Sequence, residues 1–223
     1  MLSLNTGERY INTVFDIVLE KSIVESVQYI TPFLDEVIIL EGDETVLIEA
    51  LKKVTLNGLH AEFGVYQGRS INWLSNLKKV QWYGFDSFLG LDEDWKGCFY
   101  GKGHFSLDGK PPQVNDNVEL VIGKFQDTLS KFLIEHSEPF AFINIDCDTY
   151  EATKYVLNTV KKQIVADTII SFDEYLAHPG WKIGEYKAWQ EFCIENKVEY
   201  KYLMFGRMQA VIQIKSIGEV NAT

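Results

Sequence analysis

The stretch LHAEFGVYQGRSINWLSNLKKVQWYGFD, residues 59–86, decides the fold class. Residues 59–66 form a largely apolar run that predicts a strand, and residues 69–79 predict a helix. Residues 81–85 predict a second strand directly after that helix. A strand, a helix and another strand in this order form the βαβ unit of a parallel sheet.

The alternation of strands and helices continues toward the C-terminus. The further predicted elements are strands at 118–122, 141–145 and 167–172 and helices at 127–136, 149–162 and 184–196. Two last runs, 200–205 and 209–214, predict a hairpin, which adds an antiparallel strand. The predicted fold class is therefore α/β: a Rossmann-like, doubly wound and mostly parallel sheet of seven strands with a C-terminal antiparallel hairpin strand.

Two helices are predicted before the first strand, at residues 8–30 and 43–54, from apolar side chains at helical spacing. We interpret residues 1–57 as an N-terminal helical cap of the same domain, since neither a linker nor a repeat separates them from residues 58–223. These helices and the terminal hairpin could build a homodimer, or they could pack on their own chain.

Charge and composition restrict the partners of the protein. The 223 residues include 21 Lys and Arg against 32 Asp and Glu, a formal net charge of −11. Such an acidic surface argues against nucleic-acid backbones and anionic membranes as partners. No apolar run approaches membrane-spanning length, and the start of the chain lacks a signal-peptide pattern. Three widely spaced cysteines without a C-x-x-C pair are expected to be reduced thiols in a cytoplasmic protein.

The turn after the first strand is the first candidate for ligand binding, because ligands of such sheets bind outside the carboxyl ends of the strands. Glu62, Gly64 and Gly68 lie there. A dinucleotide loop needs two further glycines, at positions where this chain has Tyr66 and Arg69. A glycine turn with a carboxylate and no phosphate cradle suits a nucleoside-type ligand without a pyrophosphate, particularly a cationic one. The alternative is a tight turn with no ligand.

The second predicted strand ends at an acid whose spacing from the glycine turn is typical of a ribose-binding residue. Asp86 follows Gly64 by 22 positions, which places it to accept hydrogen bonds from ribose hydroxyls. The long segment 87–117 comes next, and it is rich in both aromatic residues and glycines. An irregular segment of this length with many aromatic residues predicts a lid over a cleft.

More carboxylates follow the later strands. Asp146 comes directly after the strand 141–145, and Asp173 and Glu174 come after the strand 167–172. These strand ends are neighbours in a parallel sheet, so the three acids should converge. They could bind a hard cation such as Mg²⁺, or one of them could act as a base with a raised pKa. Asp148 has two interpretations of equal weight: an N-cap of the following helix, with Glu151 completing a capping box, or a functional acid.

Taken together, several motifs resemble class I S-adenosylmethionine-dependent methyltransferases, and most closely the macrocin-O-methyltransferase-like family. The resemblance covers roughly residues 55–215. The motifs that carry it, in chain order, are EFGVYQGRS, YGFDSFLGL, GHFSLDGKPPQV, VIGKFQDTL, IDCDTYEATK and SFDEYLAHPGWKIGEYKAWQEF.

The resemblance implies a role for several residues. The residues implied to contact the cofactor are Glu62, Gly64 and Gly68 at its methionine part with Tyr66 and Ser70 close by, Asp86 at the ribose, Gly123 and Phe125 at the adenine, and Asp146 beside the methyl group. Ser87 is expected among the cofactor-binding residues as well. In members that use Mg²⁺, an acid at the Asp146 position and an acid pair after the next strand bind the metal. That pair here is Asp173 and Glu174, and the metal-using members have two aspartates. Trp181 and Glu185 are implied to line the acceptor site.

Three functions are compatible with these observations. The first is methyl transfer from S-adenosylmethionine to a small-molecule acceptor, at a hydroxyl oxygen of a sugar or specialised metabolite. The acceptor proton would be removed by Asp146 or Asp148 as the catalytic base, or with the help of a metal. The second is a nicotinamide-dependent oxidoreductase, which the missing loop glycines disfavour. The third is a module that binds S-adenosylmethionine without catalysis.

Overall fold

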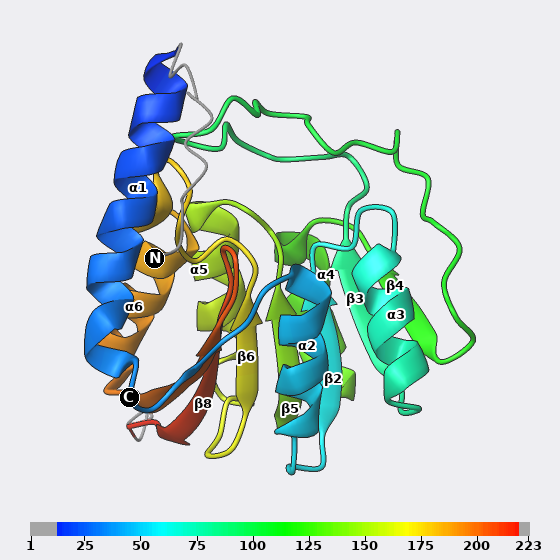
Figure 1. Cartoon of the computed structure of the whole chain (residues 1–223). Coiled ribbons are helices and arrows are strands. Elements are labelled where there is room, and N and C mark those ends of the chain that lie inside the picture. The colour runs from blue at the N-terminus through cyan, green and yellow to red at the C-terminus, as the bar shows by residue number, and fades with distance from the viewer. Residues whose placement is uncertain (1–12, 219–223) are drawn as a thin grey trace.

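The structure, a computed structural model, describes residues 13–218 and contains one mixed sheet (Figure 1). The strand order is β1-β7-β8-β6-β5-β2-β3-β4. The strands are β1 (Ile38–Ile39), β2 (Leu59–Phe63), β3 (Trp82–Asp86), β4 (Val118–Ile122), β5 (Phe140–Ile145), β6 (Ile169–Phe172), β7 (Glu199–Phe205) and β8 (Ala210–Ser216). Neighbouring strands are parallel except that β8 runs antiparallel to both β6 and β7. The predicted α/β class and Rossmann-like arrangement are confirmed.

Two strand predictions needed correction. The sheet has eight strands rather than seven, because Ile38 and Ile39 pair with the edge of β7. A two-residue strand is too short to show alternation in a sequence. The strand predicted at 59–66 ends at Phe63, because Gly64 has a φ of +93° and turns the chain away from the sheet.

The helices form two layers on the sheet. They are α1 (Val14–Ile30), α2 (Asp43–Lys52), α3 (Arg69–Leu77), α4 (Phe125–Glu135), α5 (Tyr150–Val160) and α6 (Glu185–Asn196), with short 3₁₀ turns at Thr31–Phe33 and Trp181–Ile183. One hydrophobic core joins α4, α5 and α6 to one face of the sheet. A second core joins α2 and α3 to the opposite face. Within residues 13–218, no helix combines the length and apolar character needed to cross a bilayer.

Helix α1 packs differently from the prediction. The first residues of the predicted helix, 8–12, lie outside the described residues, and Thr13 caps the described helix through a capping box with Asp16. The side chains that α1 buries are Ser22 and Ser26. The apolar residues of its sequence pattern are instead exposed, among them Val14, Ile17, Val24 and Val27. The apolar spacing therefore does not mark a face buried in this chain, and the homodimer stays a prediction.

Gly64 sets the distance between two neighbouring strand ends. Its backbone N–H donates to the Phe85 carbonyl oxygen of β3 at 2.9 Å, and Asp146 N–H donates to the Phe63 carbonyl oxygen at 2.9 Å. A Cβ atom at Gly64 would lie 1.7 Å from the carbonyl oxygen of Asp146. The turn after β2 and the loop after β5 are therefore in backbone contact, which only glycine permits here.

We expect Gly64→Ala to destabilise the protein far more than Gly103→Ala. Both glycines have positive φ, at +93° and +82°, but a Cβ at Gly103 meets no atom within 4 Å. Gly103→Ala should cost only the backbone penalty, about 1–2 kcal/mol. Gly64→Ala must also separate the two strand ends, so it should cost about 3 kcal/mol or more. Urea unfolding measures both, and equal losses would contradict the close contact.

Candidate functional site

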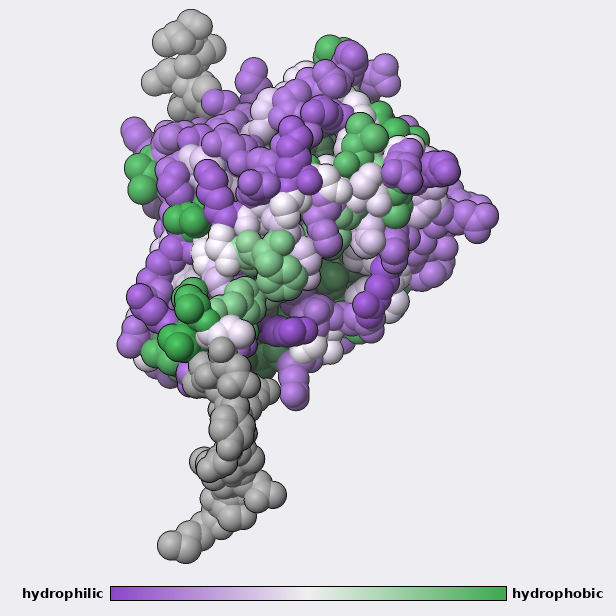
Figure 2. All heavy atoms as spheres, turned by 90° about the horizontal axis from the view of Figure 1, so that it is seen from above, coloured by the Kyte–Doolittle hydropathy of each residue, from purple (hydrophilic) through white to green (hydrophobic). Residues whose placement is uncertain are grey.

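A cavity of about 730 Å³ opens at the carboxyl ends of the parallel strands. This volume lies within the range of about 300–1,000 Å³ typical of small-molecule sites. The segment between β3 and β4 passes above this end of the sheet (Figure 1). Figure 2 looks onto this end and shows a surface on which hydrophilic residues predominate. The cavity lies where the α/β architecture predicts a ligand.

Most of the cofactor residues expected from the sequence line this one cavity. Those that do are Gly64, Tyr66, Ser70, Asp86, Ser87, Gly123, Phe125 and Asp146. Glu62 and Gly68 are not among the lining residues. Gly68 is the N-cap of α3 in a left-handed conformation, and Glu62 is fully buried behind Ser70.

Asp86 ties the glycine turn to the segment that follows β3. Its Oδ2 accepts hydrogen bonds from the backbone N–H groups of Val65 and Tyr66, at 2.9 and 2.8 Å. Its Oδ1 accepts one from Phe88 N–H at 2.7 Å. A carboxylate offers about four acceptor positions, so one further hydroxyl can donate to it. Asp86 thus shapes the turn in addition to any contact with a ribose.

Glu62 supports the wall of the cavity from beneath. Its Oε1 accepts a hydrogen bond from the Ser70 hydroxyl at 3.0 Å, and its Oε2 accepts one from the Asn144 amide at 3.1 Å. Burial raises the pKa of the Glu62 carboxyl to about 8, although both hydrogen bonds favour its charged form. Glu62 therefore acts on the cavity through Ser70 and not by direct contact.

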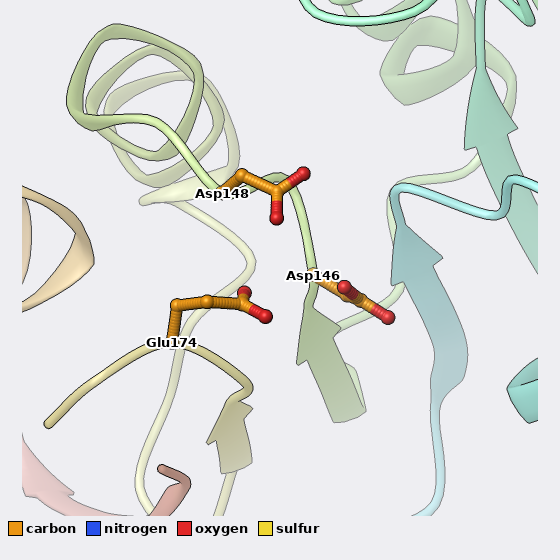
Figure 3. A group of neighbouring side chains, drawn as sticks. All are labelled: Asp146, Asp148 and Glu174. Atoms are coloured by element: carbon orange, nitrogen blue, oxygen red, sulfur yellow. The ribbon is translucent and has the colours of Figure 1, made fainter. Parts of the chain in front are cut away.

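Three carboxylates converge at the other end of the cavity (Figure 3). Asp146, Asp148 and Glu174 each bring one oxygen to within 4.8 Å of the other two. Glu174 comes from the loop after β6 and points toward the two aspartates, which follow β5. The Glu174 side chain is only 5% exposed, and its Oε2 has no hydrogen-bond partner among the described residues.

The structure excludes one of the two interpretations of Asp148, the N-cap. The N-cap of α5 is Thr149, and Asp148 precedes it with a φ of +63°. The N-cap interpretation of Asp148 is therefore wrong. Positive φ is uncommon for residues other than glycine, and Asp is among those that tolerate it. This conformation places the Asp148 carboxylate beside Asp146.

Asp173 is placed differently from the metal set expected from the sequence, which was Asp146, Asp173 and Glu174. Its Oδ1 accepts a hydrogen bond from the Gln209 side chain at 2.6 Å. Asp173 lines the same cavity, but it is not one of the three carboxylates whose oxygens converge. The structure thus groups Asp148 with Asp146 and Glu174 in its place.

The three converging carboxylates lack a positive partner. None of the ion pairs found between residues 13 and 218 involves them. Burial and neighbouring acids raise the pKa of Asp148 to about 8 and hold the pKa values of Asp146 and Glu174 well above their usual range. Each carboxylate would ionise more readily beside a bound cation.

The sequence interpretation missed several lining residues. Asp43 and Glu44 reach the cavity from α2, and Gln209 reaches it from the hairpin. Arg69 and Lys124 also line it, but both pair with acids, Glu44 and Asp92. No local motif marks these residues, because only the packing of α2 and the position of β8 bring them to the site.

The lid expected at residues 87–117 lies over the cavity. Trp95, Tyr100 and Phe105 line it from this segment. The backbone N–H of Trp95 donates to the Tyr100 carbonyl oxygen at 3.0 Å, so part of the segment folds back on itself. Trp181 and Glu185, expected at the acceptor site, are buried at 2% and 0% exposure and are not lining residues.

We expect Glu62→Gln to change how the stability of the ligand-free protein depends on pH. Because the folded pKa of about 8 exceeds the ordinary value of 4.5, the wild type loses stability as pH rises from about 4.5 to 8. Glutamine stays neutral and retains an acceptor for Asn144. Relative to the wild type, the variant should therefore gain a few kcal/mol between pH 5 and pH 8. Urea unfolding in EDTA measures this, and a constant difference would contradict the raised pKa.

Comparisons with known structures agree with this geometry. The calicheamicin methyltransferase CalS11 superposes with a TM-score of 0.63 at 21% identity, over 87% of this chain and 85% of that chain. The O-methyltransferase NovP gives a TM-score of 0.59 at 18% identity, over 77% and 79%. An O-methyltransferase from Bacillus cereus in complex with SAH gives 0.52 at 15% identity, over 95% of both chains. At these identities the similarity shows the fold.

Family membership rests on the sequence. A comparison with curated proteins finds no significant match. A family model described as a methyltransferase domain matches residues 61–175, which is more than half of the chain. The match begins in β2 and ends within the loop that follows β6, one residue past Glu174, so it includes the glycine turn and all three converging carboxylates. The chain belongs to this methyltransferase family.

Proposed function

We propose that the protein transfers a methyl group from S-adenosylmethionine to a hydroxyl oxygen of a small-molecule acceptor, as a member of the macrocin-O-methyltransferase-like group. One observation carries the proposal. A single cavity joins the glycine turn and Asp86 at one end to the cluster of Asp146, Asp148 and Glu174 at the other. The first end suits a nucleoside cofactor, and the second suits proton removal from an acceptor.

The cavity has the chemistry that a sulfonium cofactor needs. Its acids outnumber its bases, and Arg69 and Lys124 are both paired with carboxylates. Such a cavity attracts a cation. Gly64 presents backbone without a side chain beside Asp146, and Asp86 retains acceptor capacity for a ribose hydroxyl. We assign Tyr66, Ser70 and Ser87 to the same ligand because they line the same end.

The three-carboxylate cluster fits a divalent cation. Oxygen ligands about 2.1–2.5 Å from Mg²⁺ or Ca²⁺ lie within about 5 Å of one another, and these three lie within 4.8 Å. The unpartnered Oε2 of Glu174 is a free acceptor in the cluster. Asp146, Asp148 and Glu174 would hold the ion. When bound, the ion would polarise the acceptor hydroxyl and lower its pKa.

The residues of the chain also contribute directly. With its pKa raised to about 8, Asp148 is a stronger base than an ordinary aspartate and can take a hydroxyl proton when no cation holds it. Trp95, Tyr100 and Phe105 line the cavity and would shield a bound acceptor from water. Methyl transfer is an in-line displacement, so most of the rate enhancement comes from positioning the sulfonium carbon against the acceptor oxygen.

The class of acceptor is supported by a structural neighbour. CalS11 is described as a TDP-rhamnose 3′-O-methyltransferase, and that structure superposes at 24% identity with a TM-score of 0.57 over 77% of this chain. This likeness supports a sugar hydroxyl as the acceptor of the present protein. A specialised metabolite with a similar hydroxyl is consistent with the same cavity.

We expect S-adenosylhomocysteine to stabilise the protein against thermal unfolding and NAD to leave it unchanged. At a concentration of 100 times Kd, the product should add about 2.7 kcal/mol, which raises Tm by a few degrees. S-adenosylmethionine should act in the same way. Stabilisation by NAD alone would contradict the proposal and favour an oxidoreductase. Binding of both S-adenosyl ligands with no transfer to any acceptor would favour a non-catalytic module.

We expect Asp148→Asn to weaken Mg²⁺ binding at least roughly tenfold, because it removes a charged ligand. Asparagine tolerates the positive φ at this position, so the backbone should keep its shape. Asp173→Asn is the matched control, because Asp173 lines the same cavity outside the converging group. It should bind Mg²⁺ almost as the wild type does. Calorimetric titration with S-adenosylhomocysteine present measures both, and a greater loss in Asp173→Asn would restore the metal set expected from the sequence.

A further inference from the structure

Glu185, the first residue of α6, is a fully buried acid directly beneath the acidic cluster. Its side chain has 0% exposure and is not among the residues that line the cavity. Its Oε2 accepts a hydrogen bond from the backbone N–H of Glu174 at 3.0 Å. The start of α6 also lies beside the loop after β5, because a Cβ atom on the preceding residue, Gly184, would lie 3.9 Å from the carbonyl oxygen of Asp148. The other oxygen, Oε1, has no hydrogen-bond partner within residues 13–218.

These contacts reach both loops that carry the converging carboxylates. Asp146 and Asp148 lie in the loop after β5, and Glu174 lies in the loop after β6. β5 and β6 are paired in the sheet, but their register ends at Ile145 and Phe172. Beyond those residues, the separation of the loops depends on other contacts. Glu185 is placed to provide them, because it lies on a third element, α6.

The helix dipole alone does not explain why a buried acid lies at the start of α6. A carboxylate in the first turn of a helix interacts favourably with the helix dipole, typically by a few tenths of a kcal/mol on an exposed surface. Full burial of a carboxyl group costs more than that unless hydrogen bonds compensate. The bond from Glu174 N–H is such a compensation, and it satisfies a backbone donor in a loop that lies outside regular secondary structure.

We propose that Glu185 is a positioning residue, which holds the loop after β5 and the loop after β6 at the separation that lets Asp146, Asp148 and Glu174 share one cation. The proposal rests on the divalent-cation site of the proposed function. Residues that orient metal ligands through hydrogen bonds typically change metal affinity by 10–100-fold when they are removed.

The test compares Glu185→Ala with Glu185→Gln in the full-length protein. Alanine removes the acceptor of the Glu174 N–H, whereas glutamine keeps an acceptor oxygen on a side chain of the same length. Glu185→Ala should weaken Mn²⁺ binding by about 10–100-fold and speed hydrogen exchange in residues 146–149 and 173–177. Glu185→Gln should restore both properties nearly to those of the wild type. Electron paramagnetic resonance measures Mn²⁺ binding, and mass spectrometry measures exchange.

Phe192→Leu is the matched control. Phe192 is buried on the same helix, but it packs in the hydrophobic core with Trp189. This variant should lower Tm without changing Mn²⁺ affinity or exchange in the two loops. If Glu185→Ala does not fold, Glu185→Asp takes its place, because the shorter side chain withdraws the carboxyl group from Glu174 N–H. Glu185→Asp should then reproduce the losses expected for alanine.

The outcomes separate this inference from the proposed function. If the wild type binds Mn²⁺ and Glu185→Ala binds it equally well with unchanged exchange, the positioning role is wrong and the metal site stands. If the wild type binds no Mn²⁺, the metal site fails, and the exchange comparison alone decides whether Glu185 holds the two loops. Loss of binding in Glu185→Gln equal to that in Glu185→Ala would also overturn the role as a hydrogen-bond acceptor.

Discussion

The contact between the Gly64 backbone and the carbonyl oxygen of Asp146 is the constraint on which the site depends. A side chain at Gly64 would begin 1.7 Å from that oxygen, so the turn after β2 and the loop after β5 can meet only because Gly64 has none. The meeting joins the end of the cavity suited to a nucleoside to the end that carries the acids. Methyl transfer needs the sulfonium carbon and the acceptor oxygen about 3–3.5 Å apart, so the cofactor and the acceptor must bind side by side.

The second feature that determines the chemistry of the site is a cluster of carboxylates without a basic partner among the described residues. The buried Glu174 and the half-buried Asp146 and Asp148 lie together without a basic partner among residues 13–218, and the pKa of each is raised. A cluster of this kind binds a cation or holds protons. A bound cation would lower the pKa of an acceptor hydroxyl, and an ionised carboxylate of the cluster could accept the hydroxyl proton. The sulfonium of the proposed cofactor is attracted by the same charge.

The sequence predicted the positions of those candidate site residues that directly follow a strand. Buried parallel strands appear as apolar runs, so the positions of Gly64, Asp86 and Asp146 followed from periodicity and spacing. The sequence did not predict which acids form the three-carboxylate cluster and which lie outside it. Asp148 belongs to the cluster and has a positive φ, whereas Asp173 lies outside it and accepts a hydrogen bond from Gln209 of the hairpin. Such choices depend on tertiary contacts, as do the exposed apolar face of α1 and the burial of Glu185.

A crystal structure grown with Mn²⁺ and S-adenosylhomocysteine tests the central claim most directly, through the anomalous scattering of manganese. The account predicts a manganese peak bound by Asp146, Asp148 and Glu174, with the sulfur of the product in the same cavity beside Gly64. Product bound elsewhere, or bound beside Gly64 with manganese on a different set of carboxylates, would contradict it.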